Sequence, residues 1–262
     1  MSQPPNHLPP VLVVRDLCKY FGGVKALDGI DLHVAPGELL GVIGPNGAGK
    51  TALINTITGF YRATSGCVEL QGQEVSHLPM HQIGRLGIGR TFQNIRLFKR
   101  MTVLENVLVA FKQFSKSPFL SFFRNGTPKA DITSAMNWLE QLQLADHAND
   151  LAGSLSYGDA RRLEIARALA GNPQLLLLDE PAAGMNDAET EQLTQDIRKI
   201  RQHVSSILLI EHDMGVIRAL SDRVVAMDYG KKIAEGTARE VLEHPEVLRA
   251  YLGGDEEDEV RT

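Results

Sequence analysis

The chain has 262 residues, of which 43% are hydrophobic and 23% charged, and its formal net charge is −5 at pH 7. This ordinary composition excludes disordered and fibrous classes, and the mildly acidic balance argues against a nucleic-acid partner. No apolar stretch reaches the roughly 20 residues of a membrane span. Residues 1–10 lack the basic and apolar regions of a secretory signal. We therefore expect a cytoplasmic protein, with Cys18 and Cys67 as buried or half-buried thiols.

The first predicted elements are short β-like runs within residues 11–34. We expect Gly22-Gly23 and Asp28-Gly29 to interrupt them, which favours an antiparallel hairpin layer over βαβ units. Residues 66–70 and a turn around Gly72 should extend this layer.

The next segment is the octapeptide Gly44-Pro45-Asn46-Gly47-Ala48-Gly49-Lys50-Thr51. An apolar run at 39–43 precedes it, and a predicted helix at 52–58, ended by Gly59, follows. This strand–loop–helix context is what a P-loop requires, and it disfavours a glycine-rich turn that binds nothing. Backbone N–H groups and the helix N-terminus would hold nucleotide phosphates, Lys50 would reach the β/γ-phosphates, and the Thr51 hydroxyl would ligate Mg²⁺.

From Gln93 onward the pattern becomes helical, with helices predicted at 101–111 and 127–142. Thr127-Pro128 should supply the cap and first-turn proline of the second helix. Its apolar face consists of Ile132, Ala135, Met136, Leu139 and Leu142. Between the two helices, the aromatic residues at 114–123 are interpreted as lobe core or its edge, with a docking surface for a membrane partner as the alternative.

The α/β alternation resumes at Ser156. The predicted order is a helix to Ala170, a strand at 175–178, a helix at 187–202, a strand at 207–210 and a shorter α/β part ending near Leu252. Ser156-x-x-Asp159 and Asn186-x-x-Glu189 both have the spacing of a helix-capping arrangement. The acidic run 255–259 is expected to be a solvated tail.

Two carboxylates, Asp179 and Glu180, follow the apolar strand at 175–178. A buried parallel strand ends this way when its carboxyl edge faces a ligand. Asp179 would hold Mg²⁺ through water, and Glu180 would orient or deprotonate the attacking water. The alternative is a pair of acidic residues that merely cap a strand.

The order of the P-loop, Gln93, the 155–159 segment, Asp179-Glu180 and His212 resembles the nucleotide-binding subunit of an ATP-binding-cassette (ABC) transporter. The resemblance covers about residues 11–252. Within that family the chain is most similar to the ATPases of branched-chain amino acid importers. The stretches that carry this similarity are 90–93, 97–103, 180–186, 211–214 and 249–253.

The resemblance implies an α/β fold: a P-loop NTPase core with an antiparallel β layer and an inserted helical lobe. A single domain would span 11–252, divided into a core of 11–92 and 160–252 and a lobe of 93–159, with flexible tails at 1–10 and 253–262.

It also implies roles for single residues. Phe21 would stack on adenine, Gln93 would touch Mg²⁺ or the attacking water and link the site to the lobe, and His212 would contact the γ-phosphate. Ser156 and Gly158 would reach the γ-phosphate of ATP held by the opposite subunit. The catalytic residues would be Lys50, Gln93, Glu180 and His212, and the Mg²⁺-binding residues Thr51, Gln93 and Asp179. The nucleotide-binding residues would be Phe21, Gly44, Pro45, Asn46, Gly47, Ala48, Gly49, Lys50, Thr51, Ala52, Ser156 and Gly158.

The implied function is an ATPase that uses ATP and Mg²⁺ to drive import of branched-chain or other hydrophobic amino acids. Its partners would be a second ABC ATPase (identical or related), two membrane permease subunits and, indirectly, a substrate-binding protein. It would lie on the cytoplasmic face of the inner membrane. Another cargo, such as urea or lipopolysaccharide, is the alternative. A soluble non-transport ABC ATPase is disfavoured, because two cassettes or a long coiled coil do not fit in 262 residues.

Four residues depart from the family pattern. Ala52 stands where a hydroxyl is common, Tyr157 replaces a glycine, Asp159 replaces a glutamine and Asn186 stands where many members have aspartate. The loss of one hydrogen bond at Ala52 would weaken binding by about 0.5–1.5 kcal/mol. None of these departures touches the proposed catalytic residues, so we expect an active ATPase.

Overall fold

The computed structural model describes residues 8–113 and 128–252 and contains two sheets. The smaller, antiparallel sheet has the strand order β2-β1-β4-β5 and confirms the predicted hairpin layer. Its strands are β1 (Leu12–Phe21), β2 (Val24–Val34), β4 (Ser65–Leu70) and β5 (Gln73–Glu74). The expected break at Asp28-Gly29 is wrong, because β2 runs through it. A register shift between β1 and β2 accommodates Gly29, whose φ is +76°.

The larger sheet has the order β10-β9-β3-β8-β7-β6. Its strands are β3 (Leu39–Ile43), β6 (Ile88–Arg90), β7 (Leu175–Asp179), β8 (Ser206–Ile210), β9 (Arg223–Asp228) and β10 (Lys231–Gly236). All neighbours pair in parallel except β10, which is antiparallel to β9. Ile210 at the end of β8 is in register with Val42 on one side and Asp179 on the other. The residues that follow these three strands therefore meet at one edge of the sheet.

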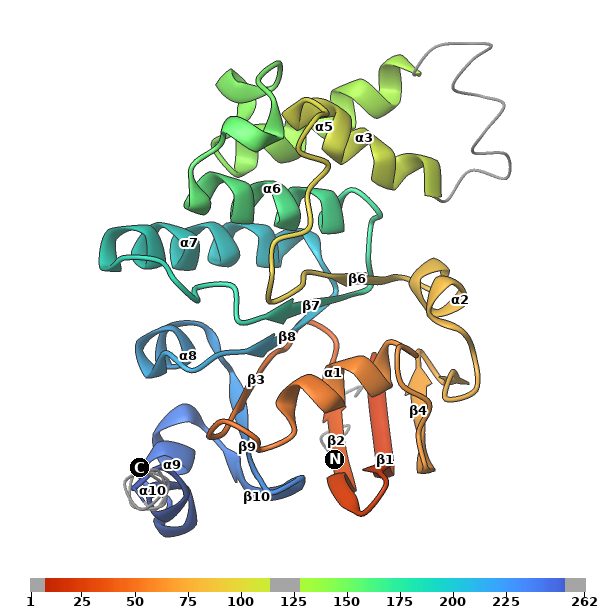
Figure 1. Cartoon of the computed structure of the whole chain (residues 1–262), viewed down its shortest axis with the longest axis vertical. Coiled ribbons are helices and arrows are strands. Elements are labelled where there is room, and N and C mark those ends of the chain that lie inside the picture. Colours follow the sequence, from red (N-terminus) through yellow and green to blue (C-terminus); the bar gives the residue numbers. More distant parts are fainter. Residues whose placement is uncertain (1–7, 114–127, 253–262) are drawn as a thin grey trace, which may run out of the picture.

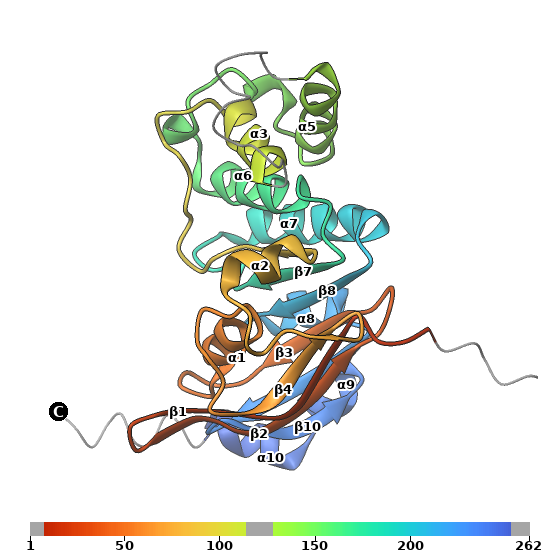
Figure 2. The same cartoon turned by 90° about the vertical axis from the view of Figure 1, so that its right-hand side faces the viewer.

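Helices cover this sheet and form a lobe at the end of the molecule far from the antiparallel sheet (Figures 1 and 2). The α-helices are α1 (Lys50–Ile57), α2 (Met80–Arg85), α3 (Val103–Gln113), α5 (Lys129–Gln141), α6 (Tyr157–Leu169), α7 (Asp187–Ile200), α8 (Met214–Leu220), α9 (Ala238–Leu242) and α10 (Pro245–Leu252). The 3-10 helices are η1 (Ala145–His147), η2 (Ala152–Ser154) and η3 (Arg201–His203). In both views α3 and α5 form the end of the lobe, and α6 and α7 lie between them and β7.

The predicted helices are confirmed, with small shifts at their ends. α3 begins at Val103 rather than Met101, and the N-cap of α5 is Pro128, so the expected first-turn proline lies one position earlier. Thr127, the aromatic residues at 114–123 and the acidic run at 255–259 lie outside the described residues. No helix of the ranges 8–113 and 128–252 is long and apolar enough to span a bilayer.

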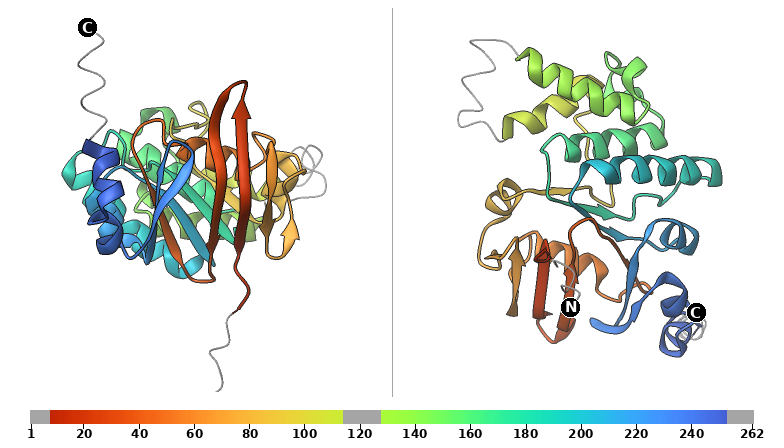
Figure 3. Two further views of the ribbon diagram at one scale, coloured as in Figure 1. Left: turned by 90° about the horizontal axis from the view of Figure 1, so that it is seen from below. Right: turned by 180° about the vertical axis from the view of Figure 1, so that it is seen from behind.

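The core is divided by the large sheet into two clusters. Figure 3 shows the ribbon of the sheet and its flanking helices from below and from behind. Leu39 and Ile43 of β3 face the helical side, whereas Leu40 and Val42 face α1 and the antiparallel sheet. Successive side chains of a strand point to opposite faces, so a strand covered on both sides has to be apolar throughout. This explains why β3 and β7 are continuous apolar runs up to their carboxyl ends, and both strands are buried throughout.

Candidate nucleotide-binding and catalytic site

The P-loop connects β3 to α1 as predicted. Lys50 opens α1, and its buried ammonium donates to the carbonyl oxygens of Gly44 (2.7 Å) and Pro45 (3.0 Å). Burial lowers the pKa of Lys50, while the nearby carboxylates of Glu180 and Asp179 act in the opposite direction. The structure thus brings Lys50 close to Asp179, the last residue of β7, and Glu180, which follows it.

Two glycines give the loop its shape. A Cβ at Gly44 would lie 2.3 Å from the Met227 carbonyl oxygen, and one at Gly49 would lie 2.4 Å from that of Ala26. Both have positive φ values, +154° and +102°. Gly49 is also the N-cap of α1 and offers no side-chain hydrogen bond, and the first turn holds no acidic residue. The amides at this helix start are therefore suited to an anionic ligand.

Asp179 lies at the buried end of β7. Its Oδ2 accepts from Arg90 Nη2 at 3.2 Å, whereas its Oδ1 is buried without a hydrogen-bond partner among the described residues. Burial raises the pKa of Asp179, and the Arg90 guanidinium lowers it. A buried carboxylate oxygen without a partner is costly unless a cation or a water occupies it.

Glu180, Gln93 and His212 form one cluster, although they are far apart in sequence. Glu180 Oε2 accepts from Gln93 Nε2 at 2.9 Å, and Glu180 Oε1 lies 2.8 Å from His212 Nε2. Glu180 is 8% exposed and has a φ of +49°, an uncommon conformation for glutamate. A strained, buried carboxylate held at both oxygens is strongly positioned.

The predicted trans segment lies on α6, and no hydrogen bond in the described parts of the chain joins it to the P-loop. Ser156 is the exposed N-cap of α6, and its Oγ accepts from Asp159 N at 3.1 Å, so the capping prediction is confirmed. Gly158 is buried beside Glu189 at the start of α7. The Asp159 carboxylate, which replaces a glutamine of the family pattern, pairs with Arg162 at 2.8 Å.

Tyr157, the glycine replacement, donates its hydroxyl to the Ala183 carbonyl oxygen at 2.9 Å. Asn186 forms a full capping box with Glu189, as its spacing predicted. Both departures from the family pattern therefore stabilise the local structure: Tyr157 through its hydrogen bond to Ala183, and Asn186 by capping α7.

Phe21 lies at the end of β1, near the tip of the hairpin. It is 44% exposed, packs edge-to-face on Tyr61 at 5.0 Å between ring centroids, and has Lys19 Nζ 4.7 Å from its own centroid. The ring is accessible, as a base-stacking platform requires, and its stacking on adenine stays a prediction.

Three residues of the site, buried Arg161 and Glu211 and half-buried Arg90, were not predicted from the sequence. Arg161 on α6 donates to the carbonyl oxygens of Phe92 (2.6 Å) and Gln93 (2.8 Å) and pairs with Glu164 at 2.9 Å. Glu211 accepts from the backbone N–H groups of Ala182 and His212. Arg90 pairs with Asp179 as described above. These three side chains hold the segments on which the predicted residues stand.

The donor set fits Mg·ATP. The uncapped start of α1 and Lys50 suit phosphate, while the Thr51 hydroxyl, the Gln93 amide and the orphaned Asp179 Oδ1 are oxygen ligands of the kind Mg²⁺ takes. The Glu180 cluster adds a group able to orient water and accept its proton. Together these groups can perform hydrolytic phosphoryl transfer.

Comparison with known proteins agrees with this chemistry. The family model for ABC transporters matches residues 27–183, and a model described as branched-chain amino acid ATP-binding cassette transporter matches residues 231–257. BraF of Pseudomonas aeruginosa and LivG of Escherichia coli K12 are high-affinity branched-chain amino acid transport ATP-binding proteins. Each is 45% identical to this chain over 251 residues, covering 93% of the chain and 98% of the relative.

Solved structures show the same fold. The ADP conformation of MJ1267, an ATP-binding cassette of an ABC transporter, superposes with a TM-score of 0.83 and 35% identity, covering 94% of this chain and all of the other. A dimeric, post-hydrolysis cassette, MJ0796 bound to ADP and Pi, has a TM-score of 0.73 and 26% identity and covers 87% and 99%. Fold and P-loop therefore define an ATP-binding cassette, the ATP-hydrolysing subunit of a transporter. The chain belongs to the ABC transporter family, among the ATP-binding proteins of its branched-chain amino acid branch, which confirms the resemblance inferred from the sequence.

Proposed function

We propose that this chain hydrolyses Mg·ATP to drive the import of branched-chain amino acids. The observation that carries the catalytic part is the Glu180 carboxylate, held at both oxygens by Gln93 and His212 and close to Lys50. The cargo rests on the relatives BraF and LivG, whose names assign it to them.

Binding begins at the P-loop. The carbonyls of Gly44 and Pro45 hold the Lys50 ammonium at the inner side of the loop, where phosphate oxygens compete for it. Charged phosphate is a stronger partner than a neutral carbonyl, so Lys50 moves to the β/γ-phosphates. Thr51, Gln93 and Asp179 would hold Mg²⁺, which supplies charge neutralisation for the phosphates.

Hydrolysis uses the Glu180 cluster. A water oxygen attacks the γ-phosphorus, the bond to the β-phosphate oxygen breaks, and the water proton passes to Glu180. Gln93 and His212 hold the carboxylate in one orientation. His212 would also donate to a γ-phosphate oxygen. Lys50 stabilises the charge that develops in the transition state.

A second cassette completes the site. Ser156 and Tyr157 at the start of α6 are exposed, whereas Gly158 is buried. Among the residues that the structure describes, the Ser156 hydroxyl bonds only within its own helix turn. A helix N-terminus stabilises an anion, so this segment suits the γ-phosphate of ATP bound to a second ABC ATPase. The dimeric form of the similar cassette supports this arrangement.

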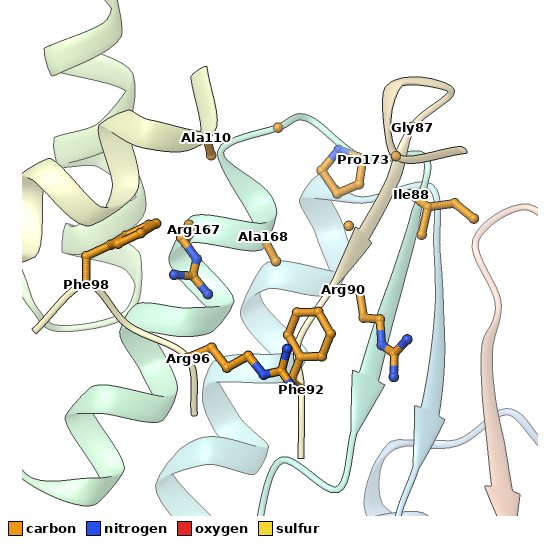
Figure 4. Close-up of a pocket in the computed structure, with 13 residues that line it drawn as sticks. Gly87, Ile88, Arg90, Phe92, Arg96, Phe98, Ala110, Arg167, Ala168 and Pro173 are labelled. Carbon is orange, nitrogen blue, oxygen red and sulfur yellow. The ribbon is translucent and has the colours of Figure 1, made fainter. Parts of the chain in front are cut away.

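Two membrane permease subunits would dock beside the lobe, with a substrate-binding protein acting through them and the ATPase held on the cytoplasmic face of the membrane. A cavity of about 320 Å³ lies there, between β6 and the helices (Figure 4). Its wall includes Arg90, Arg96 and Arg167, with Arg96 4.7 Å from the Phe92 centroid. Such a basic, aromatic surface is suited to an acidic partner segment. Arg90 connects it to Asp179.

The decisive variant is Glu180→Gln, which keeps the volume of the side chain and removes the proton acceptor. We expect ATP to bind with unchanged affinity while turnover falls by about 10²–10⁴-fold. Fluorescent-nucleotide titration and phosphate release measure the two quantities. Glu243→Gln, at the exposed C-cap of α9, is the matched control. Equal turnover of Glu180→Gln and wild type would remove Glu180 from the mechanism.

Cargo requires a separate test. With its cognate membrane and substrate-binding subunits, the chain should support uptake of labelled leucine, isoleucine or valine that depends on Glu180. Uptake of urea instead, or complementation of lipopolysaccharide export, would assign another cargo.

A further inference from the structure

The chain between β7 and α7, residues 180–186, carries the carboxylate of the site, and we call it the Glu180 loop. Its first turn is closed by a hydrogen bond from Ala183 N to the Glu180 carbonyl oxygen at 3.2 Å. Two of its residues have positive φ values, +49° at Glu180 and +79° at Gly184. A glutamate in this conformation costs free energy, so it persists only where contacts from other segments hold the loop.

Tyr157, at the start of α6, supplies one such contact. Its hydroxyl donates to the Ala183 carbonyl oxygen at 2.9 Å. A Cβ added at Gly184 would lie 3.6 Å from that hydroxyl and 3.7 Å from the ring carbon that bears it, so the phenol ring lies against the loop where the chain has no side chain. The next residue, Gly158, lies beside Glu189 at the start of α7. The first turn of α6 therefore rests on the Glu180 loop and on the helix that follows it.

The Tyr157 hydroxyl also accepts a hydrogen bond, from Arg161 one turn along α6. Arg161 Nη2 lies 3.3 Å from the Tyr157 hydroxyl and 2.8 Å from the Gln93 carbonyl oxygen. A continuous path of hydrogen bonds thus runs from the Gln93 backbone through Arg161 and Tyr157 to the Ala183 backbone. The side chains at the two ends of this path meet, because Gln93 Nε2 donates to Glu180 Oε2 at 2.9 Å.

We propose that Tyr157 is a positioning residue for ATP hydrolysis. Its hydroxyl, held between Arg161 and Ala183, sets the distance between the Glu180 loop and the segment that carries Gln93. The Gln93–Glu180 hydrogen bond, which orients the carboxylate, depends on that distance. Phenylalanine fills the space of the ring but can neither donate to Ala183 nor accept from Arg161. Glycine, the usual residue of the family at this position, offers no side chain for either contact.

The inference rests on the proposed function, in which Glu180 accepts the proton of the attacking water. Tyr157→Phe should lower the turnover number by about three- to tenfold, the effect of losing one hydrogen bond. The KM for ATP, the affinity for a fluorescent ADP analogue and the midpoint of thermal unfolding should stay close to wild type, because the ring and its packing are kept. Steady-state kinetics, titration and thermal melts measure these quantities.

Tyr20→Phe is the matched control. The Tyr20 hydroxyl also donates a hydrogen bond of 2.9 Å, but to Asp28 on the antiparallel sheet. This variant loses the same group and should keep the wild-type turnover number.

A double-mutant cycle separates positioning from a merely structural role. In a Gln93→Ala background the hydrogen bond that Tyr157 is proposed to set no longer exists, so Tyr157→Phe should then lower turnover by less than about twofold. A merely structural role predicts the same factor in both backgrounds. Hydrogen exchange of the nucleotide-free chain gives a second readout: the Ala183 amide should exchange faster in Tyr157→Phe than in wild type or Tyr20→Phe.

Wild-type turnover in Tyr157→Phe, or an equal loss in Tyr20→Phe, would overturn the proposal. So would an equal factor with and without the Gln93 side chain, or unchanged exchange of the Ala183 amide. If Glu180→Gln retains wild-type turnover, the catalytic part of the proposed function fails. The exchange measurement uses no ATP, so it still shows whether Tyr157 holds the Glu180 loop.

Discussion

The two regions proposed to enclose one ATP are built in opposite ways. On the P-loop side, Lys50, Asp179 and Glu180 are buried and bonded to their own chain. On the α6 side, Ser156 is exposed, and within residues 8–113 and 128–252 its hydroxyl bonds only to Asp159, three residues along. One half is preorganised by the fold, whereas the other is a capped helix end that faces solvent.

This difference separates the P-loop side, which a single chain can form by itself, from the contact of the α6 N-terminus with ATP, which needs a second chain. Buried groups are costly unless they are satisfied, so the fold provides Arg90, Arg161 and Gln93 as their partners. The exposed N-terminus of helix α6 carries little such cost, because water solvates it, and it can bind an anion held by another subunit. We call the P-loop side the buried half and the start of α6 the exposed half. Substitutions in the buried half should lower the stability or the catalytic activity of the single chain, whereas substitutions in the exposed half should affect only the assembled dimer.

The largest effect is expected at Arg161, which is fully buried with Glu164. Arg161→Met leaves the Glu164 carboxylate in the core without its 2.9 Å partner, and the free energy of unfolding should fall by about 3–5 kcal/mol. Urea denaturation measures this value. If the free energy of unfolding fell by less than about 1 kcal/mol, the range of exposed ion pairs, the buried half would not depend on the Arg161–Glu164 pair.

A double variant sharpens the result. Arg161→Met with Glu164→Met removes both buried charges and should recover much of the lost stability. ATP turnover should stay low, because the Gln93 carbonyl has still lost its donor at 2.8 Å and the Gln93 side chain is no longer fixed beside Glu180. Recovery of both stability and turnover would show that Arg161 has no part in placing Gln93.

The exposed half is tested by Ser156→Asp. Aspartate is as good an N-cap as serine, so the chain should stay folded, but its charge would face the γ-phosphate of the partner's ATP. We expect ATPase activity to fall by about 10²-fold or more and ATP-dependent dimers to disappear, while nucleotide binding to the monomer is retained. Thr237→Asp, at the N-cap of α9, is the matched control. Full activity of Ser156→Asp would exclude the trans contact.

The sequence predicts the local motifs of the site better than the contacts between distant segments. The P-loop and Asp179-Glu180 are local motifs at strand ends, and the fold places them as predicted. The meeting of Gln93, Glu180 and His212 was implied by family resemblance, but their direct hydrogen bonds were not.

Arg161 and Glu211 were missed for a physical reason. Each has a partner far away in the sequence: Arg161 donates to residues 68 and 69 positions earlier, and Glu211 accepts from a residue 29 positions earlier. Charged residues in a helix or after a strand are usually interpreted as solvated. A weak signal existed: Arg161 and Glu164 are three residues apart and share the face of α6 that holds buried Gly158. The expected break at Asp28-Gly29 failed because pairing with β1 overrides local turn preference.

The smallest expected effect concerns Glu211. Its carboxylate accepts hydrogen bonds from two backbone amides, Ala182 N at 2.7 Å and His212 N at 3.1 Å. Burial raises the pKa of Glu211 above its ordinary 4.5, and the amides only partly offset this. A carboxyl with a raised pKa binds more protons in the folded than in the unfolded chain. Its contribution to the free energy of unfolding is therefore greatest below about pH 4.5 and declines as pH rises through the folded pKa.

Glu211→Gln removes this titration. The stability difference between wild type and variant should therefore shift in favour of wild type as pH is lowered from 7 toward 4.5, whatever its value at pH 7. Urea unfolding at a series of pH values measures the difference, with Glu243→Gln reporting the loss of an exposed carboxylate. Because all other titrating groups are common to both chains, parallel curves for wild type and Glu211→Gln would show that burial at β8 does not perturb this carboxyl. Any pH dependence of the free energy of unfolding in the buried half would then have to come from another group. Asp179, whose pKa is also raised by burial, is the next residue to test.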